Sequence, residues 1–113
     1  ELPAVCLADA AHAMHGKGQG MDMSKAATDQ AHQDLMAGMN AMNRDMMLGG
    51  TASDIDVAFV CSMIPHHQGA VAMARIVLEH GKDPEVRKLA EAVIAAQEAE
   101  IAWMQDWLKN HQN

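Results

Sequence analysis

Two adjacent histidines, His66 and His67, lie in the middle of a segment that is otherwise apolar. On a helix, side chains three or four positions apart share one face. The resulting stripe comprises Met63, His66, His67, Ala70 and Met73. An imidazole buried on such a stripe needs a partner, because an unpaired polar group in a core costs roughly 1–3 kcal/mol. The alternatives for that partner are a carboxylate, a backbone carbonyl and a metal ion, and the neighbouring sequence favours a soft metal.

Methionine and histidine also recur in residues 1–27, a segment rich in small residues and glycine. Its candidate ligands are His12, Met14, His15, Met21 and Met23. Thioether and imidazole together suit Cu(I) or Ag(I), whereas hard cations prefer oxygen ligands. The alternative is a solvated tail in which these side chains bind nothing.

A third set of candidates lies on a predicted helix that runs from about Ser24 or Thr28 to Leu48. His32, Met36 and Met39 recur there at steps of three and four. A methionine stripe at this spacing is more often core than ligand set, because flexible thioethers fill irregular cores well. We nevertheless consider this stripe a candidate source of metal ligands, because it includes the histidine His32.

The two adjacent histidines are not equivalent, because consecutive residues differ by about 100° around a helix. One ion is therefore not bound by both His66 and His67 without distortion. We expect Met63, His67 and one residue of the first-helix stripe to form a soft-metal site. Glu100 or Gln97 would hold the imidazole in place. His66 could form a second metal site with Met73 or His80.

The elements that must position these residues are helices. A second helix is predicted from about Asp54 to His80, with Ser53 as N-cap and a kink at Pro65. Asp83 followed by proline predicts a third helix from Pro84 to about Asn110. The expected inward faces include Phe59, Ile64 and Val77 on the second helix and Val86, Leu89, Ala90, Met104 and Leu108 on the third.

No strand-like alternation occurs, so we predict an all-α antiparallel helical bundle. It consists of three long helices and a short N-terminal helical segment within Leu7 to His15. Residues 1–27 form the Met/His-rich segment and residues 28–113 the bundle. No apolar run reaches the roughly 18 residues of a membrane span. The net charge of −7 disfavours nucleic acid and anionic membranes as partners.

The only two cysteines, Cys6 and Cys61, fit no CxxC motif. In an oxidising compartment they would pair, and in a reducing one they would be free thiols. The chain begins at Glu1 without an initiator methionine, as a mature exported form would. We favour the disulfide.

Taken together, these patterns resemble a family of small bacterial secreted proteins that was long catalogued as a domain of unknown function. The resemblance covers roughly residues 30–110. The residues that carry it are Asp56, Phe59, the run Met63-Ile64-Pro65-His66-His67, Ala70, Met73-Ala74, Gly81-Lys82-Asp83-Pro84, Leu89-Ala90, Gln97, Glu100-Ile101, Met104 and Trp107-Leu108. The family is grouped with ferritin-like helical folds and includes the CopM-type periplasmic copper-binding proteins. The resemblance implies an exported helical protein that binds metal through methionine and histidine and serves copper or silver tolerance.

We therefore expect a non-enzymatic periplasmic or secreted protein that sequesters copper or hands it on. Cu(I) is the preferred ion, with Cu(II) or Ag(I) as alternatives, and copper efflux or chaperone proteins are the expected partners. A homodimer is a further expectation, since Trp103 and Trp107 would shield the bundle end or a dimer face. The alternatives are a helical interaction module that docks partners on its methionine face, and a copper-dependent oxidase. A di-iron oxidase is disfavoured, because the chain has no Glu-x-x-His.

Overall fold

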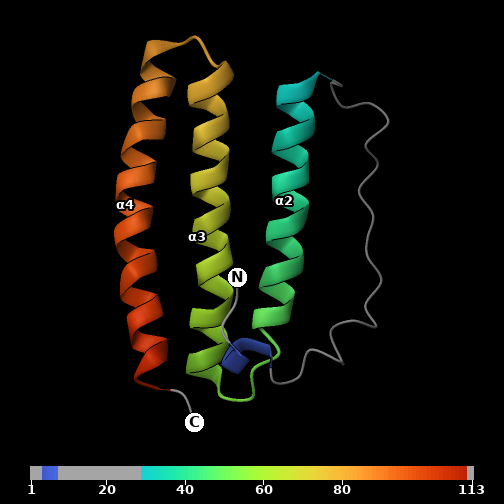
Figure 1. Ribbon diagram of the computed structural model, residues 1–113, viewed down its shortest axis with the longest axis vertical. Coiled ribbons are helices and arrows are strands. Elements are labelled where there is room, and N and C mark those ends of the chain that lie inside the picture. The colour runs from blue at the N-terminus through green and yellow to red at the C-terminus, as the bar shows by residue number, and fades with distance from the viewer. Residues whose placement is uncertain (1–3, 8–28, 112–113) are drawn as a thin grey trace.

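The computed structural model describes residues 4–7 and 29–111 (Figure 1). A short 3-10 helix, η1 (Ala4–Leu7), precedes three long helices, α2 (Gln30–Gly49), α3 (Ile55–His80) and α4 (Pro84–Lys109). The described residues contain no strand, so the all-α prediction with three long helices is confirmed for them. The predicted helical segment after Leu7 lies outside the described residues.

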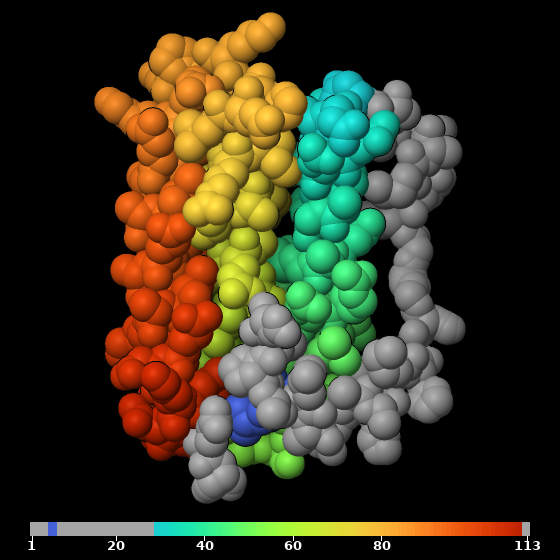
Figure 2. Space-filling view, in the orientation of Figure 1, coloured from blue at the N-terminus to red at the C-terminus, as the bar shows by residue number. Residues whose placement is uncertain are grey.

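The three helices lie side by side in one antiparallel layer, with α3 in the middle (Figures 1 and 2). The main contacts are those of α3 with α2 on one side and with α4 on the other. The principal extents of 46 × 33 × 17 Å reflect this flat arrangement. Each of the outer helices, α2 and α4, therefore packs mainly against one long helix, α3.

Each long helix begins with an aspartate whose side chain accepts a hydrogen bond from a backbone N–H of the first turn. The caps are Asp29, Asp54 and Asp83, so the prediction of Ser53 as a cap is wrong: the side chain of Asp54 holds this position. The first helix begins at Gln30, later than predicted. Hydrogen bonds from the backbone and side chain of His32, and the positive charge of that ring, hold the pKa of Asp29 below its ordinary value.

Glycine allows α2 and α3 to approach closely at two points. A Cβ atom at Gly49 would lie 2.3 Å from the carbonyl oxygen of Cys61. A Cβ atom at Gly69 would lie 2.5 Å from the sulfur of Met42. These distances are shorter than van der Waals contact, so the two positions fix how α2 lies along α3.

The largest hydrophobic core lies where η1, the start of α3 and the end of α4 meet. A disulfide joins Cys6 of η1 to Cys61 of α3, as favoured from the sequence, and both residues are fully buried. The side chains packed around it include Val57, Val60, Ile64, Met104 and Leu108. The disulfide therefore fastens η1 to the middle helix.

Several residues expected to face inward are exposed instead: Phe59 on α3 and Val86 and Leu89 on α4. The prediction failed because the described part of the chain supplies no element that covers this face of the α3–α4 pair. Ile64, Ala90, Met104 and Leu108 are buried as predicted.

Helix α3 continues without a break through Pro65, which is buried. None of the described helices has the length and apolar character needed to cross a membrane.

Candidate functional site

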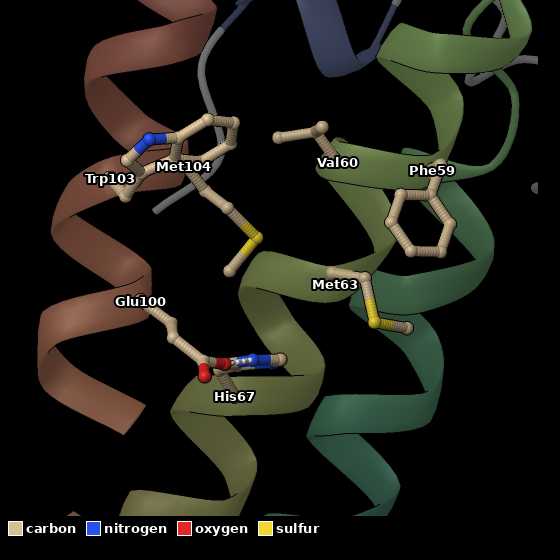
Figure 3. A pocket seen from close by; sticks show the side chains of 7 residues that line it. All are labelled: Phe59, Val60, Met63, His67, Glu100, Trp103 and Met104. Atoms are coloured by element: carbon tan, nitrogen blue, oxygen red, sulfur yellow. Dashed lines mark hydrogen bonds and ion pairs between the residues drawn. The ribbon is translucent and has the colours of Figure 1, made fainter. Parts of the chain in front are cut away.

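A cavity of about 320 Å³ lies between α3 and α4 (Figure 3). Helix α3 contributes Phe59, Val60, Met63 and His67 to its lining, and helix α4 contributes Glu100, Trp103 and Met104. Phe59 and Trp103 stand on the two sides of the cavity and are exposed to solvent. The polar atoms of the lining are concentrated in one pair of side chains, His67 and Glu100.

His67 is the central polar group of this site. Its side chain is only 13% exposed, and its Nε2 lies 2.5 Å from Oε1 of Glu100. A carboxylate accepts hydrogen bonds, so the imidazole donates its Nε2–H. In the neutral ring, Nδ1 then carries the lone pair. This atom is buried and has no hydrogen-bond partner among the described residues.

A neutral imidazole with one nitrogen bound to a carboxylate and the other carrying a free lone pair is the arrangement of a metal-binding histidine. The carboxylate fixes the tautomer and raises the basicity of the ligating nitrogen. A buried lone pair without a partner is otherwise unfavourable. With Nε2–H donated to Glu100, Nδ1 is the nitrogen of His67 whose electron pair has no partner among the described residues.

Two thioethers share the cavity with this imidazole. Met63 precedes His67 by one turn of α3, and Met104 follows Glu100 by one turn of α4. Figure 3 shows the Met104 side chain reaching from α4 towards α3. Each methionine has three rotatable side-chain bonds, so its sulfur can turn towards a bound ion. Two thioether sulfurs and one imidazole nitrogen make a soft donor set.

The structure brings Met63 and His67 together as expected, but no residue of the first-helix stripe lines the cavity. His32 lies in the first turn of α2, where its Nδ1 is 2.9 Å from Oδ1 of Asp29. Met36 and Met39 are half-buried on α2. The partner that was left open between Glu100 and Gln97 is Glu100.

The second predicted set is not gathered around one point. His66 is exposed, and its ring centroid lies 5.7 Å from that of His67. Met73 lines a separate apolar hollow further along α3. His80, at the end of α3, lies 3.8 Å from the carboxylate of Glu79. The N-terminal candidates His12, Met14, His15, Met21 and Met23 lie outside the described residues.

Sequence reasoning placed Met104 in the core only and missed it as a candidate donor. The available signal was its position four residues after Glu100, which puts its side chain on the same face of α4 as the partner of His67. Within residues 4–7 and 29–111, no three histidine, cysteine, aspartate or glutamate side chains converge. The soft donors that line the cavity are one imidazole, His67, and two thioethers, Met63 and Met104.

The protein is thus a small all-α protein in which three long helices form one layer. A cavity lined by two methionines and one histidine lies between two of these helices. The chain belongs to the family described as Domain of unknown function (DUF305), which matches residues 7–108. It is also similar to the uncharacterized protein L153 of Acanthamoeba polyphaga mimivirus, with 37% identity over 46 residues. That alignment covers 41% of this chain and 30% of the viral protein, so the chain spans less than a third of the viral protein in the match.

Proposed function

We propose that this protein binds Cu(I) in the cavity between α3 and α4 and sequesters the ion or hands it on without chemical turnover. The ligands are Nδ1 of His67 and the thioethers of Met63 and Met104. The observation that carries the proposal is the buried Nδ1 without a partner, in a ring whose Nε2 is held by Glu100. Ligand type selects the metal: thioethers and one imidazole favour Cu(I), and Ag(I) fits the same donors.

Two further features support a copper-binding role in an exported protein. The net charge of −7 attracts cations to the molecule. The buried disulfide is consistent with an oxidising compartment. With the resemblance to CopM-type proteins, these features favour a periplasmic or secreted protein of copper or silver tolerance. The ferritin-like grouping, the ligand-rich segment 1–27 and copper efflux or chaperone partners belong to the same proposal.

The test is a Cu(I) titration of the full chain against a competing chromogenic chelator, with ascorbate to keep the copper reduced. His67→Ala should remove one tightly bound equivalent, or weaken it by at least tenfold, because the variant lacks the ligating nitrogen. His66→Ala is the matched control: it removes the adjacent, exposed histidine and should bind copper as the parent does.

The thioethers are tested in the same titration with Met63→Leu and Met104→Leu. Leucine is close to methionine in volume, so the fold is preserved while the sulfur is lost. Each should weaken the same equivalent, whereas Met47→Leu on the exposed surface of α2 should not. Because imidazole must be neutral to bind a metal, affinity should also fall at acidic pH. Unchanged binding by His67→Ala would place copper elsewhere and refute this site.

A further inference from the structure

The pair of helices α3 and α4 carries two separate hollows along its length, and the cavity described above is one of them. The face of the pair that carries both hollows is called the groove below. A second hollow of about 280 Å³ lies further along the same pair of helices. Its lining is entirely apolar: Ala70, Met73, Ala74, Val77, Val86, Leu89, Ala90 and Val93. Since α3 and α4 are antiparallel, the end of α3 and the start of α4 line this hollow together.

The residues along the groove are spaced as in a helix-packing seam. On α3 the lining residues Phe59, Met63, Ala70, Met73 and Val77, with the exposed His66 between them, follow steps of four and three. On α4 the lining residues Val86, Leu89, Val93, Glu100 and Trp103, with the exposed Ala96 between them, follow steps of three and four. Only His66 and Glu100 in these two rows are polar. This is the spacing by which helices pack against further helices in a four-helix bundle.

The groove is open to solvent in the described part of the chain. Phe59, Val86, Leu89 and Trp103 along it are all exposed large hydrophobic residues. η1 does not cover them, because Phe59 lies about 200° around α3 from Cys61, to which η1 is joined. Large apolar side chains exposed on one face of a helix pair mark an interaction site.

We infer that a second copy of this chain covers the groove, so that the α3–α4 pairs of two copies form a four-helix bundle. The size of the surface supports this occupant. The lining residues span 59–77 on α3 and 86–104 on α4, a length of about 28 Å on each helix. Two helices side by side, each about 10 Å wide, present roughly 570 Å² over this length. Two copies together then bury about 1,100 Å², which exceeds the roughly 1,000 Å² expected of a biological interface.

The shape of the groove supports a twofold arrangement of the two copies. We consider a twofold axis that lies in the plane of the interface, at right angles to the helices. This axis makes the two grooves run in opposite directions, so the Phe59 and Trp103 end of each copy lies over the second hollow of the other. Large aromatic side chains then enter a hollow floored by Ala70, Ala74 and Ala90. The same patch is used by both copies, as in the isologous interfaces of most dimers.

The test is sedimentation velocity of the full chain over a concentration series. The parent should sediment as a dimer that dissociates on dilution. Leu89→Arg places a charge in the second hollow, where the proposed arrangement seats the aromatic end of the other copy, and should raise the dissociation constant at least about thirtyfold. Met47→Arg is the matched control, since Met47 on α2 is 63% exposed and Leu89 is 62% exposed. It should leave the dimer unchanged, and circular dichroism should show equal helix content in all three proteins.

A parent that stays monomeric at every concentration overturns the inference and leaves the groove to residues 8–28 or to another protein. A dimer that Leu89→Arg does not weaken also overturns it. The orientation is read from a photo-crosslinking residue placed at Trp103. Crosslinks to residues 70–93 of the second copy support the twofold arrangement, and crosslinks to its own counterpart contradict it. Leu89 lies outside the copper cavity, so copper titration of Leu89→Arg separates a failure of this inference from a failure of the proposed function.

Discussion

At the scale of single residues, the contact between His67 and Glu100 gives the two ring nitrogens different roles. Nε2 is hydrogen-bonded to the carboxylate of Glu100. Nδ1 is buried and has no hydrogen-bond partner among the described residues. Glu100 is itself exposed on α4. In the proposed site it acts as a positioning residue, because its Oε1 is bonded to the imidazole that would bind the ion.

We expect Glu100→Gln to lower Cu(I) affinity about ten- to a hundredfold, because loss of a carboxylate partner of a ligating histidine has effects of this size. Thermal stability should change little, since the residue is exposed. The measurement is chelator competition combined with a thermal melt. Glu98→Gln is the control: it removes the same charge from the same helix, but its carboxylate pairs with Arg75. Equal weakening by both variants would indicate a general charge effect and contradict a role for the imidazole contact.

Part of this site could be read from the sequence. The four-residue step from Met63 to His67 places both on one face of any helix, and Glu100 was one of two expected partners. The third donor of the proposed site, Met104, could not be read in this way. The period of a helix shows which side chains share a face but not which neighbouring helix lies opposite them. Met104 of α4 lines the cavity, where a residue of the first helix was expected.

At the scale of elements, glycine sets how the helices approach one another. Gly49→Ala should destabilise the protein, because the new Cβ would meet the backbone of Cys61, which cannot move aside cheaply. Gly69→Ala should cost less, since it meets the flexible side chain of Met42. Gly38→Ala meets nothing within 4 Å and should stabilise by about 0.5–1 kcal/mol, the difference in helix propensity.

Urea denaturation of the three glycine variants checks this order. If Gly49→Ala were as stable as the parent, α2 would not cross α3 as closely as the structure shows. If Gly38→Ala were destabilised, something other than helix propensity would govern that half-buried position. The comparison is internal, because the same substitution is made three times in two neighbouring helices.

The helices themselves were largely predictable, because their signals are local. Asp83 followed by proline marks the start of α4, and paired glycines mark the end of α2. The choice of Asp54 over Ser53 as a cap was not predictable, since both residues favour that position. The exposure of Leu89 was not predictable either. An apolar stripe indicates that a face needs covering, but the covering element need not come from the same chain.

At the scale of the whole molecule, the Cys6–Cys61 disulfide closes a loop across 55 positions of the sequence. Replacing both cysteines with alanine should reduce the free energy of unfolding by about 4 kcal/mol, because the unfolded chain regains the entropy of an open loop. Equilibrium urea denaturation of the variant and the parent measures the difference. The parent treated with a thiol reductant provides a second comparison without mutation. A change below about 1 kcal/mol would mean that the buried disulfide adds little to packing that is already sufficient.

The central place of α3 has a consequence for how the fold opens. Only α3 is packed on both sides, so α2 and α4 can each detach while the other stays in place. Local opening free energies then differ between the two outer helices. A ligand held between α3 and α4 binds only states in which those two helices are joined, and it adds its binding free energy to their opening alone. The amide hydrogens of α2 would continue to exchange with solvent at their unliganded rate. Binding of the ion would therefore slow amide exchange in α4 and leave amide exchange in α2 unchanged.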